Sequence, residues 1–293
     1  MFGFHWYGLI IGIGVLAAIQ ASTWLARRRK IDEEVLWKAA WWALAGGLIG
    51  ARLYHVLDLW TEIYALDPIS SLYIWNGGLG IIGGLIGGFI GLWLYKRFMN
   101  YDLRFMNLLD LVFFGLPIGQ AIGRLGNWIN QEVYGLPTNL PWGIYIDNKF
   151  GRFHPLFAYE ALWMLLGFAL MLLAEKTDKL NSFQKSFRGR HRRPWESGLV
   201  SDCHVANAPR NDRKCFKTDS LGWIKRSYTG FYLVWYGAGR FWLDFLRPDD
   251  FVWFVGVFNI AQAISVLMIL LGIRLLINHC ALFTNNFELY LKR

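Results

Sequence analysis

The sequence predicts an all-α protein that crosses a membrane about seven times, and three observations support this fold class. Hydrophobic residues make up 55% of the 293 residues, which is more than a soluble domain of this size can bury. Mostly apolar stretches recur at the length of roughly 20 residues that a spanning helix needs. Basic residues gather in alternate connections between these stretches. The predicted spans are 6–25, 38–57, 78–96, 106–125, 155–174, 228–246 and 252–277.

The basic connections also predict an orientation. Cytoplasmic loops of membrane proteins are enriched in Lys and Arg. With seven spans, the basic connections 27–30, 96–104 and 175–226 fall on one side. We therefore expect the N-terminus outside and the C-terminus inside, with 58–77, 126–154 and 247–251 on the outer face. Residues 1–20 have no basic region before their apolar stretch, so they are interpreted as a retained first span.

The net charge of +9 is concentrated in one segment. Segment 175–226 contains 13 Lys and Arg against 6 Asp and Glu, which accounts for +7. Because this charge lies in one connection of a membrane protein, no nucleic-acid partner is expected. We expect one membrane-embedded domain over 1–293, with 175–226 as an inserted basic cytoplasmic loop. The loop is either a solvated tether or is attracted to anionic lipid.

The same segment contains the residues that raise the question of a metal site. These are His191, Cys203, His204 and Cys215, and their spacing fits no ordinary zinc pattern. We expect neither a metal nor a cofactor.

Glycines mark the third span. Gly83 and Gly87 lie four residues apart, as do Gly84 and Gly88, which gives a smooth stripe along a helix. Close helix packing explains this stripe, and it would also let a lipid approach the backbone.

The first group of polar residues at membrane depth lies in GRLGNWINQEVYG, residues 123–135, where the fourth span meets the outer face. Arg124, Asn127 and Glu132 are costly there unless they pair with one another or meet a polar ligand. A packed cluster is one interpretation, but a ligand explains the amides better. The planar guanidinium of arginine suits phosphate.

A second group ends the sixth span in YGAGRFWLDFLRPD, residues 236–249. Arg240, Asp244 and Arg247 share one helix face, with Tyr236 one turn earlier. Arg240 and Asp244 form either a purely structural pair or part of a site, and Arg247 can also extend to the membrane interface.

A third group begins the fifth span in HPLFAYE, residues 154–160. Pro155 suits a first helical position, which places His154 at the helix start and Glu160 inside the helix. His154 is otherwise an ordinary interfacial side chain. Tyr7, Arg52 and Tyr54 add polar groups on the same predicted side.

These three motifs, with the glycine-rich IWNGGLGIIGGLIGG, resemble the prolipoprotein diacylglyceryl transferases over most of the chain. The resemblance implies an enzyme of the bacterial inner membrane. It would transfer the diacylglyceryl group of phosphatidylglycerol to the lipobox cysteine thiol of a prolipoprotein signal peptide and release glycerol phosphate. Its partners would be phosphatidylglycerol, the prolipoprotein and the bilayer.

The resemblance also implies site residues. Arg124 and Arg240 match the two essential arginines of the family and would hold the lipid phosphate and stabilise its developing charge. The remaining lipid-binding positions would be Tyr7, Asn127, Glu132, Gly135, Asp244 and Arg247, and His154 and Tyr236 are further catalytic candidates.

One departure concerns the base. Many family members have a histidine in the third span where this chain has Ile82, which cannot accept a proton. Either His154 or Tyr236 replaces it, or no strong base is needed. We favour the second account, because neighbouring cations lower the thiol pKa from about 8.5.

Two other classes of function compete with this one. A transporter or lipid flippase would also use buried arginines, but no repeated halves are evident. A non-catalytic scaffold for lipoprotein precursors would not need arginines directed at phosphate.

Overall fold

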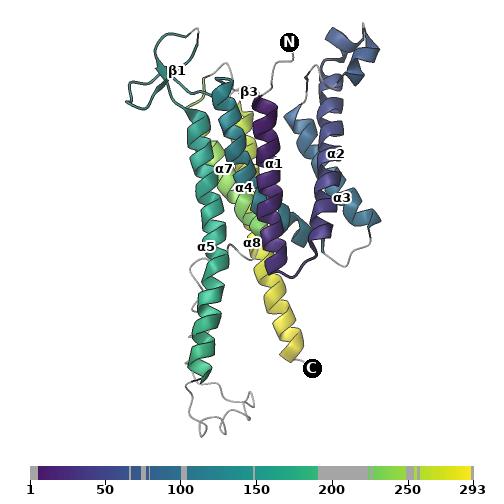
Figure 1. Cartoon of the computed structure of the whole chain (residues 1–293), viewed down its shortest axis with the longest axis vertical. Coiled ribbons are helices and arrows are strands. Elements are labelled where there is room, and N and C mark those ends of the chain that lie inside the picture. The colour runs from purple at the N-terminus through teal and green to yellow at the C-terminus, as the bar shows by residue number, and fades with distance from the viewer. Residues whose placement is uncertain are drawn as a thin grey trace. The chain divides into compact units, whose positions relative to one another are not determined.

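The computed structural model describes residues 6–65, 67–73, 77–78, 80–99, 104–147, 149–190, 224, 227–248, 254–255 and 258–291. This part of the chain is mostly helical, which confirms the all-α class (Figure 1). Its α-helices are α1 (Trp6–Arg28), α2 (Glu33–Asp58), α3 (Ile81–Phe98), α4 (Phe105–Ile129), α5 (Leu156–Arg190), α7 (Tyr228–Asp244) and α8 (Ile260–Leu291).

Four of these helices are long and apolar enough to cross a membrane. They are α1, α4, α5 over Leu156–Lys176 and α8 over Ile260–Ile277. In α8 only 11% of this apolar stretch is buried inside the protein. Apolar surface of this kind requires lipid around it, so the chain is a membrane protein.

One predicted span boundary was wrong. Window 252–277 begins too early, because strands β3 (Phe254–Val255) and β4 (Phe258–Asn259) pair before α8 begins. The Asn259 side chain then accepts hydrogen bonds from the N–H groups of Ala261 and Gln262, at 2.9 and 3.4 Å, and so caps the helix. Apolar content alone cannot separate such a strand pair from a helix.

The fifth predicted span, 155–174, agrees with the apolar stretch Leu156–Lys176, and α5 continues beyond this stretch to Arg190. Segment 175–226 therefore begins as helix. Its metal candidates His191, Cys203, His204 and Cys215 lie outside the described residues.

The chain divides into two compact units. We call Met1–Gly14 with Gln120–Arg293 the site unit, and Val15–Gly119 the glycine unit. Helices α1 and α4 each contribute to both. The units are described separately.

In the glycine unit, α2 and α3 lie side by side (Figure 1). A methyl group added to Gly50 would overlap the carbonyl oxygen of Gly83, and one added to Gly87 would overlap that of Gly46. The two backbones therefore touch along the glycine stripe. This confirms the close-packing interpretation of the third span.

Arg52 is fully occupied within the glycine unit. Its guanidinium donates to five backbone carbonyl groups, those of Ser70, Ser71, Tyr73, Gly77 and Gly78, at 2.7–3.3 Å. These acceptors match all five N–H groups of an arginine. Arg52 therefore fastens the segment that precedes α3, and its N–H groups are already used by the backbone.

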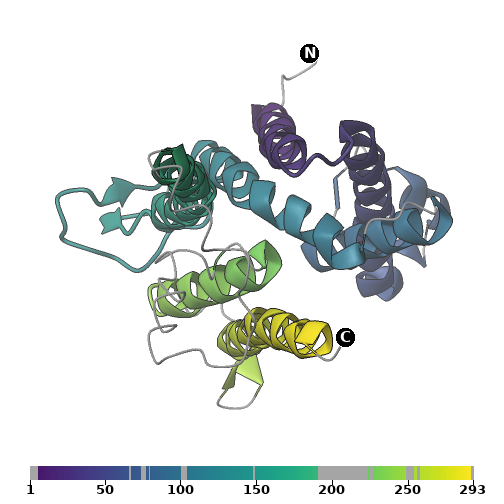
Figure 2. The same cartoon turned by 90° about the horizontal axis from the view of Figure 1, so that it is seen from below.

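In the site unit, α7 lies between α5 and α8 (Figure 2). The indoles of Trp163 on α5 and Trp235 on α7 stack with centroids 4.3 Å apart. Each indole N–H donates to the other residue's backbone carbonyl, at 2.9 Å in both directions. A methyl group on Gly239 would overlap the Trp163 indole. The tryptophan pair therefore fixes the alignment of α5 against α7.

We predict that Gly50→Ala lowers the thermal stability of the protein in detergent, by about 1–3 kcal/mol, because the added methyl group meets backbone that cannot move aside. Gly8→Ala is the matched control. Nothing lies within 4 Å of its methyl position, so it should be neutral or stabilise by about 0.5–1 kcal/mol. Equal melting temperatures for the two variants would contradict the backbone contact.

Candidate functional site

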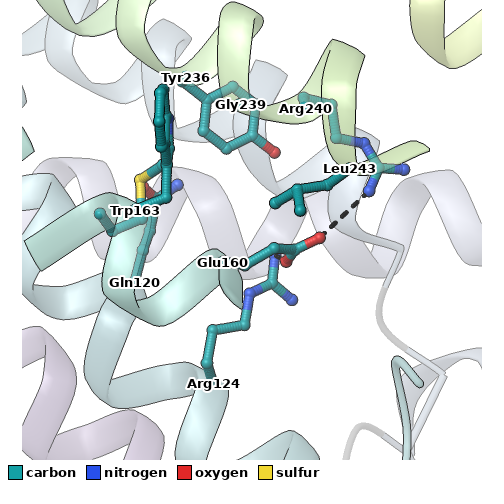
Figure 3. A pocket seen from close by; sticks show the side chains of 9 residues that line it. Gln120, Arg124, Glu160, Trp163, Tyr236, Gly239, Arg240 and Leu243 are labelled. Carbon is teal, nitrogen blue, oxygen red and sulfur yellow. Dashed lines mark hydrogen bonds and ion pairs between the residues drawn. The ribbon is translucent and has the colours of Figure 1, made fainter. Parts of the chain in front are cut away.

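Helices α4, α5 and α7 bring their polar residues to one pocket (Figure 3). Arg124 comes from α4, Glu160 from α5, and Arg240 and Tyr236 from α7. The remaining lining residues are Gln120, Trp163, Met164, Gly239 and Leu243. Charged side chains thus occupy one part of the pocket and mostly apolar side chains the other.

The carboxylate of Glu160 is the centre of the charged part. Its side chain is only 8% exposed, and three arginines pair with it. Arg124 pairs with its Oε2 atom, while Arg247 and Arg240 reach its Oε1 atom at 3.2 and 3.4 Å. Figure 3 shows this carboxylate between Arg124 and Arg240. One anion therefore holds three cations, one from α4 and two from α7 and the turn that follows it.

Asp244 adds a second carboxylate to the cluster. Its side chain is 1% exposed, and its Oδ1 atom lies 3.5 Å from Arg240 and 3.8 Å from Arg247. Asn259 donates a hydrogen bond to its Oδ2 atom. Arg240 and Asp244 thus share one face of α7 as predicted, whereas Arg247 lies beyond the end of the helix and reaches the same cluster from the turn that follows. The site has three guanidinium groups against two carboxylates, which leaves a surplus of positive charge.

Burial affects Arg247, the least exposed of these arginines. Desolvation and the nearby Arg240 lower the pKa of Arg247 from its ordinary value, while Glu160 and Asp244 oppose this effect. Arginine remains protonated at neutral pH in proteins. Arg247 is therefore a permanent part of the positive charge.

Asn127 connects the cluster to the loop that follows α4. Arg124 donates to the amide oxygen of Asn127 at 3.1 Å, and the Asn127 amide donates to Glu132 at 3.5 Å. Glu132 is exposed and also accepts from Asn130. The predicted trio is thus connected, but Arg124 forms its ion pair with Glu160.

Gly135 lies where two backbone segments meet. Its N–H donates to the His154 carbonyl at 2.8 Å, and a methyl group on it would lie 2.7 Å from the Leu246 carbonyl oxygen. The position requires glycine because the backbones approach closely.

The other predicted site residues fall into two sets. Tyr236 lines the pocket, and its ring stacks on Tyr232 with centroids 5.7 Å apart. His154 does not line it, and its Nδ1 atom lies 3.2 Å from the Tyr159 hydroxyl. Tyr7 also lies outside the lining and packs against Gly126.

Six of the nine residues that line the pocket were missing from the predicted site, and Glu160 and Gln120 are the two among them with a carboxylate or amide side chain. Glu160 was recognised as part of the third motif but received no role, although it is the only acidic residue in window 155–174. That isolation was a usable signal. Gln120 lies four residues before Arg124 and so shares its helix face, but only the fold shows that this face lines a pocket.

We predict that Glu160→Gln destabilises the protein by about 3–5 kcal/mol, because removing this anion leaves three arginines close together with only Asp244 to compensate them. Thermal unfolding in detergent measures this. Glu132→Gln makes the same chemical change at an exposed side chain and should change stability little. Equal losses in the two variants would show that Glu160 does not hold the cluster.

Comparison with known proteins places these residues in a family. The family model described as prolipoprotein diacylglyceryl transferase matches residues 1–189 and 216–278. Three relatives named phosphatidylglycerol–prolipoprotein diacylglyceryl transferase come from Trichormus variabilis, a Synechocystis species and Fervidobacterium nodosum. They are 34%, 33% and 32% identical to this chain over 92% of its length and over 83%, 83% and 80% of theirs. The chain therefore belongs to the prolipoprotein diacylglyceryl transferase family.

Proposed function

We propose that this protein transfers the diacylglyceryl group of phosphatidylglycerol to a cysteine thiol of a prolipoprotein, the first step of bacterial lipoprotein maturation. The observation that carries this proposal is the convergence of Arg124, Arg240 and Arg247 on Glu160, a residue of the pocket lining, with a surplus of positive charge. An anionic lipid phosphate suits such a site.

The proposed reaction is a displacement at the carbon of the diacylglyceryl group that is bonded to the phosphate oxygen. The thiolate sulfur of the prolipoprotein attacks this carbon and forms a thioether. The bond from the carbon to the phosphate oxygen breaks, and its electron pair leaves with glycerol phosphate. The charge that grows on that oxygen is stabilised by guanidinium groups already in place, which lowers the barrier without a cofactor or metal.

Arg124 and Arg240 are the residues best placed for this role. Both line the pocket, and their side chains are 26% and 21% exposed, so an incoming phosphate can reach them. Arg247 and Asp244 complete the charge arrangement. Asn127 and Glu132 form the outward branch of the network, where the head group would lie. Tyr7 and Gly135 would act indirectly, by holding the backbone around the site in place.

The thiol needs a proton acceptor or a low pKa. Ile82 provides no acceptor, and His154 lies outside the pocket lining. Of the two candidate bases, His154 and Tyr236, only Tyr236 lines the pocket. We favour activation by the arginines, because nearby cations lower the thiol pKa and increase the fraction of thiolate near neutral pH.

The proposal includes a membrane arrangement. We propose that α2, α3 and α7 also cross the bilayer, which gives seven spans with the N-terminus outside and the C-terminus inside. The pocket then faces the outer leaflet of the bacterial inner membrane, where the lipobox cysteine of a translocated precursor is found. The alternating basic connections support this orientation.

The whole chain would act as one membrane-embedded catalytic domain, with 175–226 as a basic cytoplasmic insertion. The gap in the family match between residues 189 and 216 supports an insertion. Deleting residues 191–215 should leave turnover of the purified protein within about twofold, because α5 and α7 carry the site residues and lie outside the deletion. Loss of turnover on anionic vesicles alone would instead favour the lipid-attraction interpretation.

The test uses purified protein, phosphatidylglycerol vesicles and a lipobox peptide. We expect a diacylglyceryl thioether peptide together with one equivalent of glycerol phosphate, both measured by mass spectrometry. A transporter or a scaffold would yield neither product, so their absence would overturn the proposal.

We predict that Arg124→Ala abolishes this turnover, because it removes a cation from the departing phosphate, whereas His154→Gln keeps measurable activity. Initial rates at saturating peptide measure both. The reverse pattern would exclude activation by arginines and make His154 the base.

A further inference from the structure

Two uncharged polar side chains of the pocket, Gln120 and Tyr236, each lie one helical turn before an arginine. Gln120 precedes Arg124 by four residues on α4, and Tyr236 precedes Arg240 by four residues on α7. One turn corresponds to about 5.4 Å along the helix axis. Two of the three helices thus present an arginine and, one turn earlier, an uncharged polar side chain to the same pocket.

The amide of Gln120 is held in one orientation. The buried Tyr232 hydroxyl donates a hydrogen bond to the Oε1 atom of Gln120 at 2.9 Å. With the oxygen occupied, the Nε2 amino group is the part of the amide left to serve the pocket. Within the described part of the chain, this amino group makes no hydrogen bond to another residue.

The neighbouring side chains are poor alternatives as donors. Met164 and Leu243 are apolar, and the Trp163 N–H already donates to the Trp235 carbonyl. Figure 3 shows the Tyr236 hydroxyl pointing toward the side where Glu160 and Arg240 meet. Gln120 is therefore the donor at the mostly apolar end of the pocket.

We propose that Gln120 donates a hydrogen bond to an ester carbonyl of the diacylglyceryl group, and that Tyr232 positions it. This inference rests on the proposed function, which places the lipid phosphate at the arginines. The ester carbonyls of a phospholipid lie only a few covalent bonds from its phosphate, on the side of the acyl chains. A carbonyl taken from the membrane interface into an apolar pocket requires a donor.

The proposal implies that Gln120 makes the protein bind diester phospholipids more tightly than diether phospholipids. A dialkyl ether analogue of phosphatidylglycerol has the same head group and chains but no ester carbonyl. The test compares the affinities of the diester and the diether for the full-length protein in detergent, by displacement of a fluorescent phosphatidylglycerol. This readout does not depend on turnover.

For the wild-type protein we expect the diester to bind roughly five- to tenfold more tightly than the diether, because the diether leaves the Gln120 donor unpaired. Gln120→Leu should weaken diester binding, leave diether binding unchanged or better, and bring the ratio of the two dissociation constants close to one. Tyr232→Phe keeps the amide but releases it, so its ratio should fall between these values.

Met164→Leu is the matched control, because it changes the same wall of the pocket without changing a donor. Both dissociation constants should move together in this variant. A wild-type ratio near one, or an unchanged ratio in both Gln120→Leu and Tyr232→Phe, would overturn the inference. So would loss of the preference in Tyr236→Phe alone.

The two proposals fail in different ways. If the wild-type protein binds the diester selectively but forms no thioether, the proposed function fails and the lipid selectivity stands. If thioether forms without a dependence of the affinity ratio on Gln120, the selectivity fails and the function stands.

Discussion

The site depends on the ion pairs between the buried carboxylate of Glu160 and three arginines. Guanidinium groups repel one another, and the repulsion grows where water is excluded. Arg124 on α4 and Arg240 on α7 can share a pocket because an anion on α5 lies between them. Asp244 extends the same compensation to Arg247. The carboxylates compensate only part of the charge, and the proposed function assigns the remaining positive charge to an anionic lipid.

Arginine has two different roles in this chain, and the difference lies in its acceptors. Arg52 donates to five backbone carbonyls, so its hydrogen-bonding capacity is used in holding a segment of chain. Arg124 and Arg240 bind carboxylates and keep part of their surface accessible. A carboxylate can yield some of its partners to a phosphate without unfolding the backbone, whereas five carbonyls cannot. The type of acceptor therefore separates the structural Arg52 from Arg124 and Arg240, to which the proposed function assigns substrate binding.

Much of the fold followed from apolar length and glycine spacing, because both act through local helix geometry. The shared face of Arg240 and Asp244 followed from helical periodicity for the same reason. The partner of Arg124 did not, because Glu160 lies far away in the sequence and meets it only through the packing of α4 and α5. The early start of the last predicted span has a similar cause. The described residues of the strand pair before Ile260 are mostly apolar, like those of the helix that follows. The side chain of Asn259 caps α8 and marks where the strand ends and the helix begins.

The tryptophan pair limits how the site can open. Trp163 and Trp235 bind each other's backbone carbonyls, so α5 and α7 are pinned at one level along their length. Glu160 and Arg240 lie less than two turns from this level. Because Glu160 and Arg240 lie so close to the tryptophan pair along the helices, a small tilt of α5 or α7 moves these charged groups little. Entry of a bulky lipid is therefore easier through movement of the helices and loops not joined by the pair than through separation of α5 from α7.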